Sequence, residues 1–167
     1  MFFHYTDQFK LIVPLRCAST TLHDYFGYTH RQSYYDHDLA EFRKGDCVRA
    51  VVLRHPFERY HSACALMPDH IGSQEWAWHF APFLHDLDQV LWHYIPFEQL
   101  GLYAASTSAR TVVRSVVNCQ LREADYAANP YTSYQQLVEE VELYHKALRT
   151  QSRLSVSDWH RLTARSV

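Results

Sequence analysis

Two short apolar runs in the first third of the chain have the pattern of buried strands. One spans Lys10 to Pro14 (KLIVP), and the other spans Val48 to Leu53 (VRAVVL). Both are rich in aliphatic residues and almost continuously apolar, which is typical of a parallel strand covered on both faces. Each run is followed by a loop and a helical pattern. Strand, loop and helix therefore occur twice in succession.

Helical periodicity follows each of these runs. The first predicted helix spans Ser19 to Phe26, with Ser19 or Thr20 near its N-cap. The second spans Pro56 to Met67, with a proline suited to its first turn. A short helix is also predicted around Leu39 to Arg43, within a long polar and aromatic excursion that we expect to lie above the sheet.

Beyond residue 90 the pattern predicts one more strand and then mostly helix. The strand candidate spans Val90 to Ile95. An apolar stripe follows, formed by Val112, Val113, Val116, Val117 and Leu121. Two capping boxes, Ser133 with Gln136 and Ser155 with Asp158, mark the starts of the last two helices. The prediction is one α/β domain over residues 1–167, a small parallel sheet flanked by helices with a helical C-terminal third.

Composition narrows the class of protein. The chain has 167 residues, of which 47% are hydrophobic, and a formal net charge of −2, so no overall basic field indicates nucleic-acid binding. Its four cysteines have no CxxC spacing, and its twelve histidines are scattered, which favours reduced thiols and no metal site. No apolar segment is long enough to span a membrane, so we expect a cytoplasmic protein.

The first loop, Arg16 to Thr21 (RCASTT), has the chemistry of an anion site. A turn from strand to helix presents unpaired backbone N–H groups, and the helix N-terminus adds a positive partial charge. Hydroxyl side chains and the permanent charge of Arg16 supply further donors. The pattern predicts a bound phosphate or sulfate, and the alternative interpretation is an ordinary N-capped helix.

The second loop begins with Arg54 at the end of the strongest strand, and Ser62 follows on the next helix. We expect Arg54 to bind an anion with help from the Ser62 hydroxyl, and the alternative is a structural ion pair with a nearby Asp or Glu. The chain lacks GxxxxGK[ST], and Arg54 stands where a nucleotide hydrolase places its magnesium-binding Asp. The pattern therefore favours two directly bound anions without a metal.

These segments resemble the sulfotransferase family, which transfers a sulfuryl group from 3′-phosphoadenosine 5′-phosphosulfate (PAPS). "LIVPLRCASTTL" is similar to the family's first motif, and "VVLRHPFERYHSA" matches the second, of the form R-[D/N/H]-P-x-x-R-x-x-S, at Arg54, Pro56, Arg59 and Ser62. "YIPFEQL" is similar to a weaker third segment. Arginine replaces the usual lysine of the first motif, as in the tyrosylprotein branch, and the usual glycines are missing.

The resemblance implies a P-loop-like sulfotransferase fold and assigns roles to the loop residues. The 5′-phosphosulfate would lie on Arg16 and the loop formed by Cys17, Ala18, Ser19, Thr20 and Thr21, and the 3′-phosphate on Arg54 and Ser62. Arg16 would act as an electrostatic clamp in an in-line transfer, because arginine does not readily give up a proton.

The transfer needs a general base and a hydroxyl-bearing acceptor. The family places the base between the two motifs, where His37 is our first candidate and a pKa near 6.5 suits proton abstraction. Its rivals are His30, Asp36, Asp38, Glu41 and His79. The acceptor, whether carbohydrate, peptide tyrosine, lipid or small metabolite, is expected to contact the Trp- and His-rich segment 70–93. Two other functions stay open, a catalytically reduced PAP-binding module and a small P-loop-like kinase.

Overall fold

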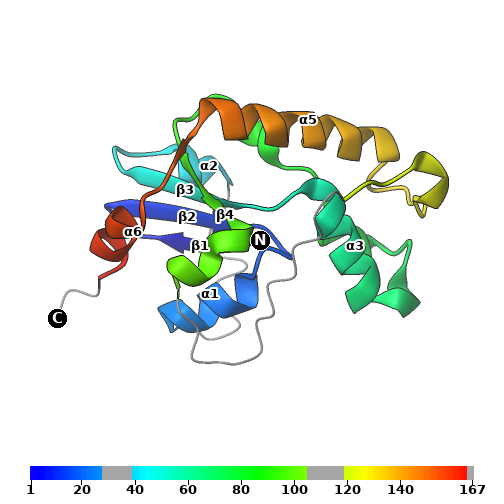
Figure 1. Cartoon of the computed structure of the whole chain (residues 1–167), viewed down its shortest axis with the longest axis horizontal. Coiled ribbons are helices and arrows are strands. Elements are labelled where there is room, and N and C mark those ends of the chain that lie inside the picture. The colour runs from blue at the N-terminus through cyan, green and yellow to red at the C-terminus, as the bar shows by residue number, and fades with distance from the viewer. Residues whose placement is uncertain (28–38, 105–118, 165–167) are drawn as a thin grey trace.

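The computed structural model describes residues 1–27, 39–104 and 119–164. In this part of the chain, a five-stranded sheet forms the centre of an α/β fold (Figure 1). Its order is β1-β2-β3-β4-β5, with β2 to β5 parallel and β1 antiparallel to β2. The strands are β1 (Phe2–Tyr5), β2 (Phe9–Val13), β3 (Val48–Leu53), β4 (His93–Pro96) and β5 (Ser152–Arg153).

The predicted small parallel sheet is present as β2 to β5, and β1 adds an antiparallel strand that the sequence did not predict. β1 pairs antiparallel with β2, with Phe2 opposite Val13. A tight turn makes this possible: the Thr6 hydroxyl accepts a hydrogen bond from the Phe9 backbone N–H at 3.0 Å, and the Thr6 N–H donates to the Phe9 carbonyl at 2.8 Å. The sheet is therefore mixed but mostly parallel. β3 has the predicted bounds, whereas β4 begins three residues later than expected.

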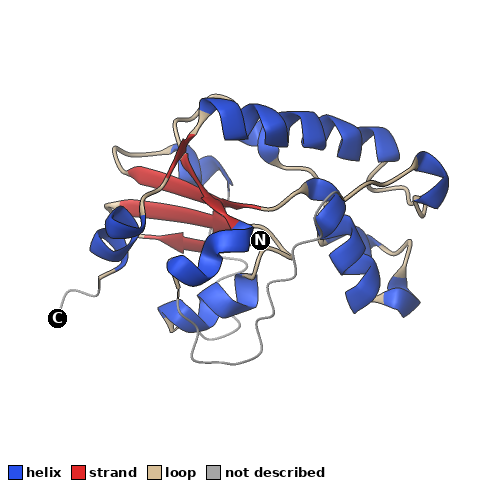
Figure 2. Ribbon diagram, viewed as in Figure 1, coloured by secondary structure: helices blue, strands red, loops and turns tan. Residues whose placement is uncertain are grey.

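Helices surround the sheet (Figure 2). They are α1 (Ser19–Phe26), α2 (Leu39–Arg43), α3 (Pro56–Leu66), α4 (Gln74–Trp78), α5 (Tyr134–Thr150) and α6 (Val156–Thr163), with 3₁₀ turns η1 (Pro68–His70), η2 (Leu84–Leu87), η3 (Phe97–Leu102) and η4 (Glu123–Asp125). The predicted capping box of Ser133 and Gln136 is present at the start of α5. The predicted valine stripe lies almost entirely outside the described residues.

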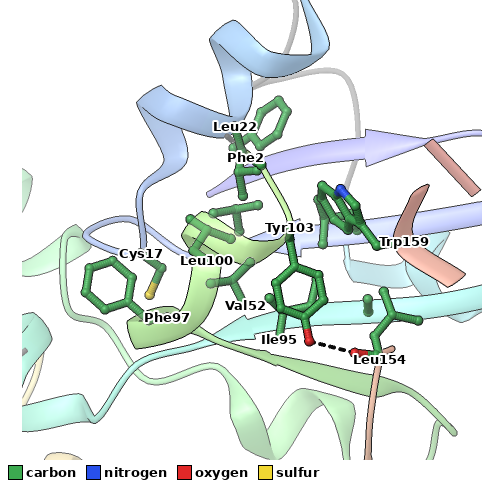
Figure 3. Close-up of a cluster of buried hydrophobic side chains, with 14 of the residues drawn as sticks. Phe2, Cys17, Leu22, Val52, Ile95, Phe97, Leu100, Tyr103, Leu154 and Trp159 are labelled. Carbon is green, nitrogen blue, oxygen red and sulfur yellow. Dashed lines mark hydrogen bonds between the residues drawn. The ribbon is translucent and has the colours of Figure 1, made fainter. Parts of the chain in front are cut away.

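Alternating side chains of the strands enter two different cores. Phe2, Leu11 and Val52 face α1, α6 and η3, and Tyr103 of that core donates its hydroxyl to the Leu154 carbonyl at 2.7 Å (Figure 3). Phe3, Ile12 and Val51 enter the opposite core with residues of α2, η2 and α5. Both faces of the sheet are covered, as the nearly continuous apolar strands indicate.

A third apolar cluster lies beyond the carboxyl end of β3. Tyr60 of α3, Trp76 of α4 and Leu137 of α5 meet there. This cluster supports α3 where it leaves the sheet at the right of Figure 1. It fixes the helix that follows Arg54, and thus one wall of the region between the ends of β2 and β3.

Candidate anion site

The two sequence motifs meet at the carboxyl ends of neighbouring parallel strands. β2 ends at Val13 and β3 ends at Leu53, and the two strands pair directly. Arg16 Nε donates to Ser62 Oγ at 3.0 Å, and Arg54 Nη1 donates to the Arg16 carbonyl at 2.7 Å. These two hydrogen bonds join residues that are separated by 46 and 38 positions in the chain. Such strand ends are the usual ligand position in open α/β sheets.

The loop after β2 has a left-handed backbone at two residues that are not glycine. Arg16 has φ 64° and Ala18 has φ 62°, and the intervening Cys17 does not share this positive φ. Each such conformation costs an L-residue roughly 1–2 kcal/mol. The Cys17 N–H donates to the Pro14 carbonyl at 3.1 Å, and its side chain is fully buried beside Phe97 (Figure 3). The missing glycines are thus replaced by strained residues held by tertiary contacts.

The start of α1 differs from its predicted form. Ala18, rather than Ser19 or Thr20, is the N-cap residue, and its carbonyl accepts the Leu22 N–H at 3.1 Å. Because alanine has no side-chain acceptor, it cannot cap the backbone N–H groups of the first turn. Ser19 and Thr21 are buried and Thr20 is exposed. Backbone N–H groups left without a partner in a turn before a helix N-terminus are typical of concavities that bind anions.

Arg54 is in a buried ion pair, the alternative that its sequence context left open. Its Nε lies 3.3 Å from Glu58 Oε2, and the two side chains are 8% and 5% exposed. The guanidinium also stacks on the Phe97 ring, 4.3 Å from the ring centroid. Arg54 therefore already forms an ion pair with one carboxylate while it donates a hydrogen bond to the Arg16 carbonyl.

Electrostatics around the loop favour an anion. Burial, together with the neighbouring Arg54, lowers the pKa of the Arg16 guanidinium. Burial also lowers the pKa of Arg59, with Arg54 again contributing. Burial raises the pKa of the Cys17 thiol to about 11, so this thiol stays neutral and cannot act as a counter-charge. A bound anion offsets the repulsion between these neighbouring guanidinium groups and favours their charged forms.

The candidates for the general base differ in where they lie relative to the loop after β2. His37 and its neighbours His30, Asp36 and Asp38 lie outside the described residues. Glu41 pairs with Lys44 at 3.0 Å, and its carbonyl accepts from Lys10 near the amino end of β2, away from the loop. Burial and the positive charge of Arg16 lower the pKa of the His79 imidazole.

His79 closes α4, whose two tryptophans have different environments. Trp76 is fully buried in the third apolar cluster, whereas Trp78 is 57% exposed. Of the two, only Trp78 keeps the exposure that contact with an acceptor requires. The His79 Nδ1 atom is buried and has no hydrogen-bond partner among the described residues.

Two buried carboxylates, Glu58 and Glu140, were not named by the sequence interpretation. Glu58 lies in the first turn of α3, four positions after Arg54, which itself precedes that helix. The sequence interpretation expected a nearby Asp or Glu as the alternative partner but did not name Glu58. Glu140 lies on the buried face of α5 with Leu137 and Ala147, and it is 1% exposed. It accepts the backbone N–H of Phe83 at 3.0 Å and of Leu84 at 3.2 Å. Its place three positions after Leu137, where helical periodicity puts a core residue, was the available signal.

Comparison of the chain with protein-family models, with curated proteins and with solved structures gave no match. Within residues 1–27, 39–104 and 119–164, no helix is long and apolar enough to cross a membrane. The same residues contain no group of three or more His, Cys, Asp or Glu side chains placed to hold a metal ion.

Proposed function

We propose that this protein is a sulfotransferase with a P-loop-like sulfotransferase fold that uses PAPS as the sulfuryl donor. The observation that carries the proposal is the Arg16–Ser62 hydrogen bond of 3.0 Å, which joins the two motifs at adjacent strand ends. An anion-binding arginine and a hydroxyl from separate motifs thereby share one site. This arrangement suits a ligand with two anionic groups on one nucleotide.

In this proposal Arg16 and the backbone N–H groups of residues 18–21 bind the 5′-phosphosulfate. Ser62, with Arg54, binds the 3′-phosphate. The Arg16–Ser62 hydrogen bond is then exchanged for bonds to the two ends of the nucleotide. Arg16 stays charged throughout and stabilises the negative charge that develops on the departing phosphate as the S–O bond breaks.

The acceptor hydroxyl gives its proton to a base. His37 is the first candidate, and His30, Asp36, Asp38 and His79 are its rivals. Because the pKa of His79 is lowered, its imidazole is neutral and able to accept a proton at pH 7. Single His37→Gln and His79→Gln substitutions test these two histidines. The variant that lacks the base loses transfer and keeps nucleotide binding, whereas the other retains both.

The Arg54–Glu58 ion pair supports a second candidate function, a PAP-binding module with reduced catalysis. Glu58 already offsets part of the positive charge that would hold the 3′-phosphate. Such a module would bind PAP, the desulfated nucleotide, without transferring a sulfuryl group to any acceptor in a broad panel. Stronger, magnesium-dependent binding of ATP would instead support a small kinase.

Thermal unfolding with PAP tests the binding half of the proposal. At a concentration 100 times its Kd, a ligand stabilises by roughly 2.7 kcal/mol, and each kcal/mol raises the Tm of a chain of this size by roughly 2–4 °C. We expect PAP to raise the Tm more than ATP with Mg²⁺ does. Ser62→Ala and Arg16→Ala should diminish the shift.

Exposed residues of the same types provide matched controls. Ser152→Ala, in the edge strand β5, and Arg122→Ala, whose guanidinium pairs with Asp125, should leave the PAP shift intact. A wild-type protein whose Tm does not respond to PAP would refute the proposal.

A further inference from the structure

Arg59 belongs to the second motif but does not face the proposed ligand. It is 2% exposed, and its guanidinium lies over the Phe83 ring, 5.2 Å from the centroid. Its Nε donates to the Leu15 carbonyl at 3.3 Å. Its Nη2 donates to the Ala81 carbonyl at 3.3 Å and to the His79 carbonyl at 3.5 Å. One side chain thus joins the loop after β2 to the segment after α4.

The Leu15 carbonyl is important because it belongs to the peptide plane that enters the left-handed part of the loop. Fixing a carbonyl fixes the N–H on the other side of the same planar peptide bond, here that of Arg16. Arg54 fixes the next carbonyl, that of Arg16, in the same way. Two arginines of the second motif therefore set the orientation of two successive peptide planes of the first.

We propose that Arg59 is a positioning residue that maintains the left-handed geometry of Arg16 and Ala18. In this role it replaces the conformational freedom that glycine would provide. The proposal explains why a loop without glycine can hold its shape: the strained residues are restrained by a buried cation from another element. The effect of this positioning role on PAP affinity rests on the proposed function.

Loss of Arg59 should let the loop leave this geometry for part of the time. A ligand that needs the native loop then binds with an apparent Kd raised in proportion to the lost population. Ala18→Gly removes the cost of positive φ at that position, so it should restore the native loop when Arg59 is missing. Ala18→Gly alone measures what the substitution itself does to PAP binding, and the recovery in the double variant is counted relative to that single variant.

The experiment compares wild type, Arg59→Lys, Ala18→Gly and the double variant. PAP affinity is measured by titration calorimetry, and hydrogen–deuterium exchange is measured in the peptide covering residues 15–22. Arg59→Lys should raise the Kd by roughly tenfold or more, and added Ala18→Gly should recover at least about threefold. Exchange should become faster in Arg59→Lys and slower again in the double variant.

Ala65→Gly is the control, because Ala65 is exposed on α3 and does not have positive φ. A recovery by Ala18→Gly no greater than that by Ala65→Gly would overturn the inference. If wild type does not bind PAP, the proposed function fails, and the exchange data alone decide the role of Arg59. If Arg59→Lys does not fold, Phe83→Leu, which removes the aromatic face under the guanidinium, takes its place in the same comparison.

Discussion

Glu140 offers the sharpest test of how the region behind the site is stabilised. Its carboxylate is almost completely buried on α5 and accepts the N–H groups of Phe83 and Leu84 at the start of η2. Glu140→Ala would leave both buried N–H groups without this acceptor. At roughly 1–3 kcal/mol for each unsatisfied group, the free energy of unfolding should fall by about 2–6 kcal/mol. Glu140→Gln keeps one acceptor oxygen and should cost less.

The cost of Glu140→Gln should also depend on pH. Burial raises the pKa of Glu140, although the two N–H groups and the charge of Arg59 oppose this shift. A carboxyl whose folded pKa lies above its unfolded value stabilises the fold most at low pH, and that contribution is lost as pH rises through the folded pKa. Wild type therefore loses an advantage over the neutral glutamine variant as pH rises. Glu140→Gln should be less destabilising at about pH 8 than at about pH 5.

Urea unfolding followed by circular dichroism measures both effects. Glu142→Ala and Glu142→Gln are the matched controls, because Glu142 is exposed on the same helix. The controls should change the free energy of unfolding by no more than about 0.5 kcal/mol. A Glu140→Ala protein as stable as Glu142→Ala would refute the account of a buried carboxylate holding two N–H groups. So would a Glu140→Gln cost that grows with pH.

Two further predictions concern the loop and its supports. Arg54→Ala should lower the free energy of unfolding by roughly 3–5 kcal/mol, because Glu58 loses its buried arginine. In urea unfolding, an Arg54→Met, Glu58→Gln double variant should recover much of that loss. Equal stability of the single and double variants would contradict the coupling of the two residues. Complete burial raises the pKa of Cys17 to about 11, so its thiol should resist iodoacetamide in the native protein and react in urea. Half-buried Cys47 should react under both conditions, and mass spectrometry measures the alkylation of each residue. Native alkylation of Cys17 as fast as that of Cys47 would contradict its burial.

The sequence predicted elements whose local pattern is strong. α1 and β3 have the predicted bounds, because a buried strand and an amphipathic helix each leave a clear periodicity. β1 was missed, because four residues that pair through a tight turn leave too short a pattern. The juxtaposition of Arg16, Arg54 and Ser62 followed from the rule that parallel strands end at one edge of the sheet.

Partners within the site were harder to predict, because they depend on tertiary contacts. Nothing local in "PLRCAST" indicates that Arg16 and Ala18 would adopt positive φ, since the contacts that hold them come from Arg54 and Arg59. The N-cap of α1 is Ala18, one of the two residues with positive φ. Glu58 is the kind of nearby carboxylate that the alternative interpretation of Arg54 expected, whereas the acceptors of Arg59 are backbone carbonyls that carry no sequence signal.

β5 has a consequence for how copies of this chain meet. In the part of the chain that the structure describes, it is the edge strand next to β4, and its two residues, Ser152 and Arg153, are both exposed. An exposed edge can recruit a strand from another molecule, but a very short edge that carries a charge offers few free backbone groups for such pairing. This side of the sheet is therefore protected against edge-to-edge aggregation, and crowding many copies together at high concentration should not extend the sheet through β5.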